Sequence, residues 1–163
     1  AKVSASWRHD FGTRLFALYI PALEWNRNYQ SAGVSADYLL LQQELGAGVS
    51  LLDREDRQLR LGVAENRFDV WITEPARSHE GTNVESIFVE AEWVLPWRIT
   101  LTERGVYYYD LGARNEGWEN KFQVNKQLTE TLSIGLLHEL RENSPDSRVA
   151  DYTLLKLLIG LDF

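Results

Sequence analysis

The chain has 163 residues, a formal net charge of −7, 12% aromatic residues and no cysteine. This length suits one domain over residues 1–163, and the absence of cysteine excludes disulfides and thiolate chemistry. The negative charge argues against a general nucleic-acid binder, and no run reaches the roughly 18 apolar residues of a transmembrane helix. The first residues lack the basic and apolar regions of a signal peptide, so such a peptide either was removed, which we expect, or never existed.

Strands are predicted along almost the whole chain, because side-chain character alternates with a period of two and no segment shows helical periodicity. Residues 1–11 look like a strand and are interpreted as a periplasmic lead-in or an added edge strand. About eight strands follow, at 13–25, 33–51, 57–73, 85–95, 97–110, 117–128, 131–141 and 151–163. They exceed the usual globular strand of about 5–6 residues and fit tilted membrane-spanning strands of about 9–11 residues.

The last predicted strand has one wholly apolar face, made by Leu155, Leu157, Ile159, Leu161 and Phe163. The opposite face is mixed and includes Lys156 and Asp162. In a soluble β protein the apolar face would form a buried core. In an outer-membrane barrel it would meet lipid, and the mixed face would line a small lumen. Alternation by itself leaves both readings open.

Two places depart from regular alternation. Glu103 falls on the face of its strand that is otherwise apolar, for which a bulge or an off-centre depth in the membrane is the expected explanation. In the strand at 57–73 the apolar positions change parity between Leu59–Val63 and Phe68–Ile72. We therefore expect a β-bulge near Ala64–Arg67.

The predicted connections alternate between long and short. The long polar connections are 25–33, 73–85, 110–117 and 142–150, and the short ones are 52–57, 95–97 and 128–131. Outer-membrane barrels are built with short periplasmic turns and longer outer loops. The alternation therefore favours an antiparallel, up-and-down transmembrane β-barrel over a soluble sandwich.

Aromatic residues gather at the predicted strand ends. The expected girdle at the long-loop end consists of Trp25, Trp71, Tyr107, Tyr109 and Trp118, and that at the short-turn end of Trp93 and Trp97. Two girdles of amphipathic rings are typical of a protein that sits in a bilayer. A general preference of aromatic residues for strands is the alternative explanation.

Charged residues of both signs occupy the predicted inward face: Glu44, Arg60, Glu90, Glu92, Arg98, Arg104, Lys121, Glu139, Arg141, Lys156 and Asp162. An eight-stranded barrel is just wide enough for side chains to fill its interior. These charges therefore predict a plugged, salt-bridged interior in preference to a charged conduit. Glu92 and Arg98 are expected to pair across the turn at Pro96.

The signal for catalysis is weak. The chain has three histidines, His9, His79 and His138. His79 follows Ser78 in a predicted loop, where a solvated histidine is the simpler interpretation than a nucleophile–base pair. No cluster has the spacing of metal ligands. No catalytic residue, metal or cofactor is assigned.

From about Gly46 to its end, the chain resembles the salt-induced outer-membrane protein family, whose function is uncharacterised. The residues that carry the resemblance are GAGVSLLDREDRQLRLGV and LTETLSIGLLHELRENSPDSRVADYTLLKLLIGLDF, including the Asn143-Ser144-Pro145 loop and Asp151. The resemblance implies an outer-membrane barrel and no catalytic residues.

A second resemblance is to the lipid A palmitoyltransferase. Leu18-Tyr19-Ile20-Pro21-Ala22 followed by Trp25 is similar to the first strand of that family, and Gly46-x-Gly48-x-Ser50-x-x-Asp53 to a later hairpin. The family implies a catalytic histidine close to the tryptophan, and the next residue here is Asn26. It also implies an Asp-Ser pair near Phe68-Asp69, where this chain has no serine. The resemblance supports the fold and leaves lipid A acylation as the alternative function.

Together these observations predict an integral β-barrel of about eight strands in the outer membrane of a Gram-negative bacterium. The expected role is non-enzymatic: structural, adhesive or, in a porin-like manner, that of a narrow conduit. Its expected partners are membrane lipid, lipopolysaccharide and the barrel-assembly machinery. Phe163, which ends the apolar face of the last strand, resembles the terminal signal that this machinery recognises.

Overall fold

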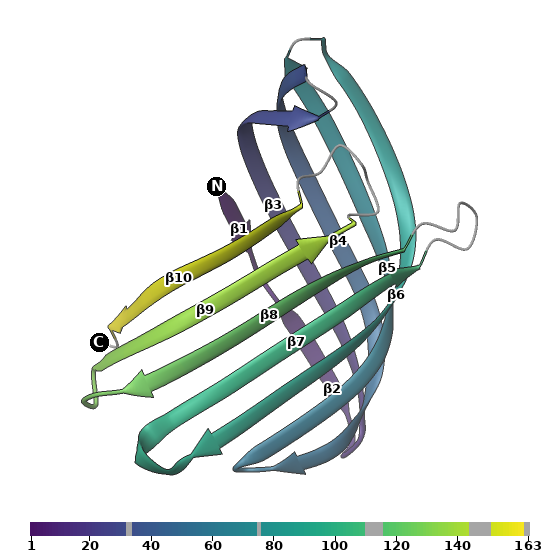
Figure 1. The fold of residues 1–163 in the computed structure, drawn as a ribbon. Helices are drawn as coiled ribbons and strands as arrows, with labels where there is room; N and C mark the ends of the chain where they lie inside the picture. Colours follow the sequence, from purple (N-terminus) through teal and green to yellow (C-terminus); the bar gives the residue numbers. More distant parts are fainter. Residues whose placement is uncertain (32–33, 75, 110–115, 144–150, 162–163) are drawn as a thin grey trace.

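The computed structural model describes residues 1–31, 34–74, 76–109, 116–143 and 151–161. In these residues ten strands form one antiparallel sheet that curls into a half-barrel (Figure 1). The strands are β1 (Lys2–Ser4), β2 (Trp7–Phe11), β3 (Leu15–Ser31), β4 (Val34–Arg54), β5 (Arg57–Glu74), β6 (Ser78–Leu95), β7 (Ile99–Tyr109), β8 (Glu116–Gln127), β9 (Leu132–Glu142) and β10 (Tyr152–Leu161). A short 3-10 turn, η1 (Pro96–Arg98), joins β6 to β7. The described chain holds no helix that is long and apolar enough to cross a membrane.

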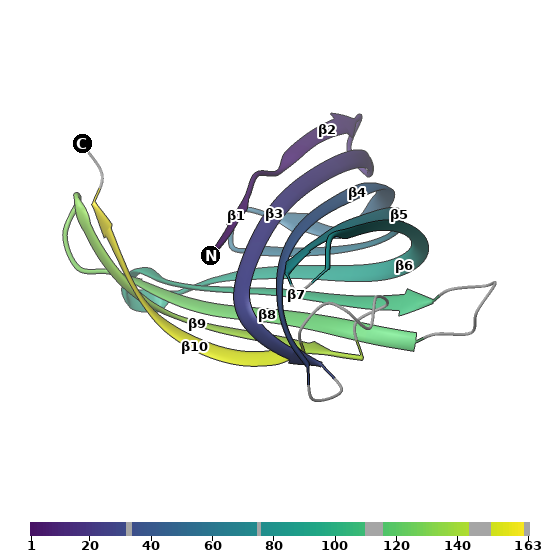
Figure 2. The ribbon, with the colours of Figure 1, turned by 90° about the horizontal axis from the view of Figure 1, so that it is seen from above.

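The prediction of an antiparallel all-β fold is confirmed, and β3 to β10 each overlap one predicted strand. Neighbours in the chain are neighbours in the sheet from β3 to β10. Seen from above, β3 to β6 curl over an inner face, and β7 to β10 continue the sheet beneath it (Figure 2). The inner face is the concave side of this curl, and the outer face is its convex side.

Residues 1–11 form an added edge of the sheet. Both β1 and β2 pair with β3 in one continuous register, in which Ser4 lies opposite Ala22 and Trp7 opposite Tyr19. The interruption between β1 and β2 lies opposite Pro21, which has no N–H to donate to the neighbouring strand. Ala5 still donates its N–H to the Pro21 carbonyl, at 3.1 Å. The two short strands therefore act as one edge strand from Lys2 to Phe11.

The predictions of long loops at 25–33 and 73–85 are wrong. The β3–β4 pairing continues to Ser31 opposite Val34, and the β5–β6 pairing continues to Ile72 opposite Ser78. A pair of antiparallel strands that extends into water carries polar residues on its exposed faces. Its composition therefore resembles that of a loop, although its backbone groups stay paired. The other two predicted long loops lie largely outside the described residues.

The predicted β-bulge near Ala64–Arg67 is also wrong. β5 keeps one register against β6 from Arg57 to Ile72, and the same stretch of β5 meets β4 without a shift at Ala64–Arg67. Phe68 and Val70 instead point to the inner face, where both are fully buried. The change of parity marks a passage from an apolar outer face to an apolar inner face along one unbroken strand.

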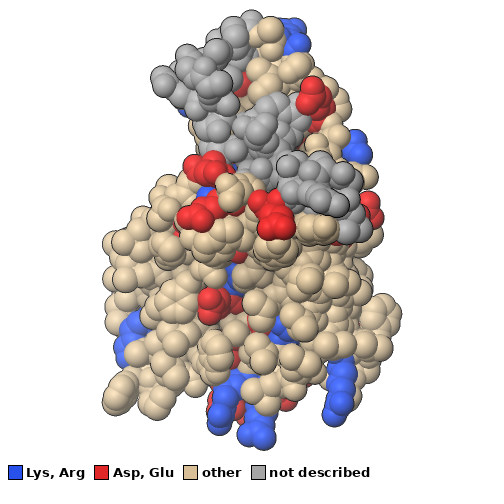
Figure 3. Space-filling view, turned by 45° about the vertical axis from the view of Figure 1, so that its right-hand side comes forward, with Lys and Arg blue, Asp and Glu red and all other residues tan. Residues whose placement is uncertain are grey.

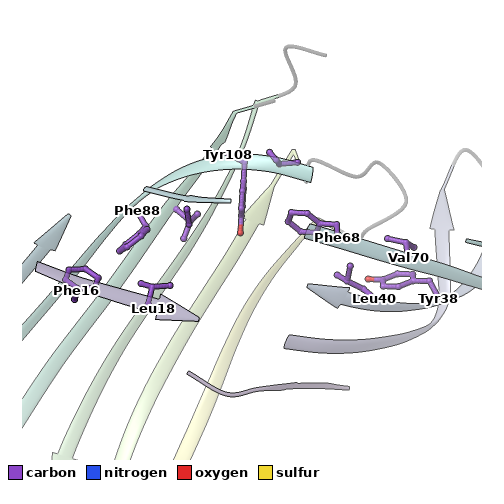
Figure 4. Packing of buried hydrophobic residues seen from close by; sticks show 11 residues of the cluster. Phe16, Leu18, Tyr38, Leu40, Phe68, Val70, Phe88 and Tyr108 are labelled. Carbon is purple, nitrogen blue, oxygen red and sulfur yellow. The ribbon is translucent and has the colours of Figure 1, made fainter. Parts of the chain in front are cut away.

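The hydrophobic core lies on the inner face of β3 to β7 (Figure 4). Its members are Phe16, Leu18, Tyr38, Leu40, Ala64, Phe68, Val70, Val84, Phe88, Val106 and Tyr108. Phe68 meets Tyr108 edge-on, with ring centroids 5.7 Å apart. The core thus fills the strongly curled part of the sheet, and on β8 to β10 the inner face mixes charged residues with apolar ones such as Leu137.

The outer face carries a second set of apolar side chains that are exposed. Alternation places them opposite the buried positions, and the exposed members on the central and last strands include Leu45, Val49, Leu61, Val63, Ile87, Val89, Ile134, Leu136, Leu155, Leu157 and Ile159. We call these residues the outer apolar band. On β10 its side chains reach about two thirds exposed or more, with Leu155 at 72%.

Candidate functional site: an ion-paired cluster on the inner face

Alternation along the strands brings charged side chains together on the inner face. The groups that join in ion pairs there are Glu24, Glu44, Arg60, Glu90, Arg104, Glu119, Lys121, Glu139, Arg141 and Lys156. We call these residues the inner ion-pair cluster. It holds five carboxylates and five cations, so its formal charge is balanced.

Arg104 on β7 joins the first part of the cluster. Its Nε lies 3.0 Å from Glu90 on β6, and its Nη2 is hydrogen-bonded to Glu44 on β4. Arg60 on β5 approaches the same Glu90 carboxylate at 3.9 Å. The Arg104 guanidinium also lies over the Phe88 ring, 5.4 Å from its centroid. The charged cluster therefore begins where the hydrophobic core ends.

Arg141 on β9 is the most buried cation of the cluster, with 1% of its side chain exposed. Its Nε donates to Glu119 on β8 at 2.8 Å, and its Nη1 donates to Glu24 on β3 at 3.1 Å. The guanidinium stacks on Tyr152, 4.8 Å from the ring centroid. Its Nη2 has no hydrogen-bond partner among the described residues. A buried charge with this many partners fixes the positions of the strands that supply them.

Glu139 on β9 forms the third part of the cluster. Its carboxylate lies 2.5 Å from Lys156 on β10 and 3.9 Å from Lys121 on β8. Both lysines are about half exposed. These pairs border a cavity of about 550 Å³ on the inner face, which Glu44, Arg104 and Glu119 also line.

The cluster has the character of a structural, charge-balanced interior. Its cations and carboxylates are paired with each other. The described residues also contain no group of three or more potential metal ligands. The cavity can admit water and small polar solutes beside the paired charges.

The structure places most of the predicted inward charges together, and separates two of them. Arg98 lies in the η1 turn, whereas Glu92 lies on β6 opposite Thr102. No ion pair joins Glu92 to Arg98 among the described residues. The predicted pair is missing because Arg98 belongs to the turn and not to β7. Trp97 and Arg98 both adopt positive φ, and the chain reverses within Pro96–Arg98. Asp162 lies outside the described residues.

Sequence reasoning missed Glu24 and Glu119, although both bind the buried Arg141. The alternation of side chains along each strand indicates that both residues point inward. Leu23 and Trp25 point outward, so Glu24 between them points inward, and Glu119 follows the outward Trp118.

The predicted girdle residues fall at several levels. On the outer face, Trp25, Trp93, Tyr107 and Trp118 are exposed, and Trp97 is the most exposed of the tryptophans, in the η1 turn. Tyr109 is half-buried at the end of β7. Trp71 lies farther along β5 than the charged residues Glu65 and Arg67, and stacks on His79 with ring centroids 4.6 Å apart. Phe163, the predicted assembly signal, lies outside the described residues.

His79 forms part of a separate polar group on the β5–β6 ribbon. Its Nε2 lies 3.3 Å from Asp69, which also accepts hydrogen bonds from Arg67 at 2.9 and 3.0 Å. The Arg67 hydrogen bonds hold the pKa of this carboxyl, which lies beyond the outer apolar band, below its usual range. Ser78 precedes His79 and points to the opposite face. No hydroxyl in the described part of the chain is hydrogen-bonded to His79, so the geometry contains a His–Asp pair without a nucleophile.

Comparison with known proteins gives no match of significance to this chain among protein-family models, curated proteins or solved structures.

Proposed function

We propose that the protein is an integral β-barrel of the outer membrane, with a non-enzymatic structural, adhesive or narrow-conduit role. The observation that carries this proposal is the arrangement of the two faces over β7 to β10. The outer face exposes Leu136, Leu155 and Leu157, and the inner face of the same strands buries Glu139 and Arg141. In water this distribution is unfavourable, because apolar area stays hydrated while charges are desolvated. In a bilayer the outer band meets hydrocarbon.

The height of the outer apolar band supports the proposal. On β6 the outward residues from Ile87 to Leu95 are uncharged, which is eight steps or about 26 Å along the strand. At a strand tilt of about 40° this gives about 20 Å of depth, close to the apolar band of about 25 Å in outer-membrane barrels. The next outward residues toward the long-loop end are Glu85 and, opposite it on β5, Glu65. Figure 3 shows a broad, largely uncharged band with acidic residues toward one end and basic residues at the other.

The interior supports a structural role better than a wide channel. The inner ion-pair cluster crosses from β3 to β9, and the adjoining cavity measures about 550 Å³. A conduit through this interior would be narrow and lined by paired charges. The proposed partners are membrane lipid and lipopolysaccharide around the outer band, and the barrel-assembly machinery during insertion.

The proposal is tested by comparing two neighbours on opposite faces of β8. Val124 lies on the outer face, opposite Leu101 and Leu136, and Gln123 lies on the inner face. Val124→Arg should lower the free energy of unfolding in lipid vesicles by about 2–4 kcal/mol near the midplane, and less near an interface. Gln123→Arg is the matched control and should cost less. An equal or reversed order in urea titrations would contradict the membrane assignment.

A further inference from the structure

The curled sheet has two edges without a backbone partner among the described residues. One is β10, and the other is the strand formed by β1 and β2 in line. Each edge strand is ten residues long, 152–161 and 2–11. β10 is antiparallel to β9, and β1–β2 is antiparallel to β3; because β3 and β9 point the same way, the two edges run in the same direction.

Side chains already connect the two edges at one end. Lys2 Nζ donates to the Tyr152 hydroxyl at 3.4 Å. Arg141, which neighbours Tyr152 in the sheet, reaches Glu24, which neighbours Lys2. At the other end the edges diverge, and the end of β10 lies apart from β2 in both ribbon views (Figures 1 and 2). The first residues of the two strands are therefore in contact, and the remaining residues are separated.

The faces of the two edge strands match when Lys2 is set beside Tyr152. Each residue of the first edge then lies beside the residue numbered 150 higher, so inner positions of one strand lie beside inner positions of the other. The inner positions of the first edge are all polar: Lys2, Ser4, Ser6, Arg8 and Asp10. On the outer face, Thr153, Leu155, Leu157 and Ile159 of β10 would lie beside Val3, Ala5, Trp7 and His9 of the first edge. A slip by one residue would place Leu155 and Leu157 beside the polar inner positions of the first edge.

We propose that β10 pairs in parallel with β1–β2 in the membrane, with each residue of 2–11 beside the residue numbered 150 higher. β3 to β10 supply eight strands and β1–β2 supplies one, so the closed barrel has nine strands and one parallel pair. The inference rests on the proposed membrane location, because open sheet edges do not occur in hydrocarbon, where no water satisfies their N–H and C=O groups. Closure within the chain also removes the edges that would otherwise pair with other molecules.

Disulfide trapping tests this register directly, because the chain contains no cysteine. Ala5→Cys with Leu155→Cys places two outward thiols side by side, within the Cα separation of about 4.4–6.8 Å that a disulfide requires. Ala5→Cys with Ile159→Cys is the matched control, because the second thiol is then displaced by four residues, or about 13 Å. Mild oxidation of a whole-cell lysate, which is then separated into outer membranes and an aqueous fraction, should yield at least tenfold more internal disulfide in the first variant.

Three other outcomes would overturn the proposed closure. These are no disulfide in either pair, a preference for the control pair, or efficient covalent dimers of the single variant Leu155→Cys, which would show that a second copy covers β10. Fractionation of the same samples separates this failure from failure of the membrane assignment. Protein that is in the outer membrane but does not link contradicts closure alone. Protein that links internally but stays in the aqueous fraction supports closure and contradicts the membrane assignment.

Discussion

Arg141 on β9 donates a hydrogen bond to Glu24 on β3 at 3.1 Å, although the two residues are 117 positions apart and their strands are not neighbours in the sheet. The contact spans the concave side of the curl. It joins β9 to β3, each of which is one strand in from an edge of the sheet, through one buried guanidinium that Glu119 also holds. The inner face is thus organised around a charge that is stable only while its partners remain in place.

Removal of this charge should therefore be costly. Arg141→Met leaves Glu24 and Glu119 without their cation, and we expect a loss of about 3–5 kcal/mol in the free energy of unfolding. Urea titration in lipid vesicles measures the loss. The triple variant with Glu24→Gln and Glu119→Gln removes the stranded carboxylates and should recover most of it. Unchanged stability in the single variant would show that the cluster does not support the fold.

Glycine at position 62 allows Phe88 to pack against β5. A Cβ built on Gly62 would lie 2.3 Å from Phe88 Cζ and 2.6 Å from the Ala47 carbonyl oxygen. Gly62→Ala should therefore destabilise the protein by about 1–3 kcal/mol, as overpacked sites do. Gly105→Ala is the control, because its Cβ would meet Val89 at 3.4 Å, an ordinary contact. Equal unfolding midpoints for the two variants would contradict this packing.

Much of the fold could be predicted from alternation, and the interior could be predicted only in part. A period of two identifies strands and their faces, but it does not say which face is inside. β5 shows the difficulty: Leu61 and Val63 are apolar and outward, whereas Phe68 and Val70 are apolar and inward. Read from the sequence, that change resembles a bulge, because an apolar residue is assumed to keep one side.

Pairs across the interior depend on curvature and strand tilt, which no local pattern contains. Arg141 and Lys156 could be assigned to the inner face from parity. That Arg141 meets Glu24 follows only from the curl that brings β9 toward β3. The pairing of Trp71 with His79 is hidden in the sequence for a different reason, because polar residues in a paired hairpin have the composition of a loop.

Glu103 is a charged residue within the outer apolar band. It lies opposite Ala91 and Phe122 in an unshifted register, which excludes a bulge at β7, and it accepts a hydrogen bond from Asn120 at 3.1 Å. Glu103→Gln keeps this hydrogen bond and removes the charge. In vesicles it should raise the free energy of unfolding by about 1 kcal/mol, because a carboxylate is disfavoured near hydrocarbon.

The control for this substitution is Glu130→Gln in the exposed turn between β8 and β9, which should change stability little. If Glu103→Gln gains no more stability than the turn variant, Glu103 faces water.

The proposed membrane location depends most directly on whether lipid or water meets the outer apolar band, and a spin label distinguishes the two. A nitroxide attached to Leu136→Cys, a side chain 50% exposed on the outer face, is compared in lipid vesicles with one attached to Glu85→Cys beyond the band. Relaxation by oxygen, which concentrates in hydrocarbon, and by a water-soluble nickel chelate is measured for both labels. If lipid covers the band, oxygen relaxation is strong and nickel relaxation is weak at position 136, and the reverse holds at position 85. Equal nickel relaxation at the two positions would show that water covers the band and would contradict the proposed membrane location.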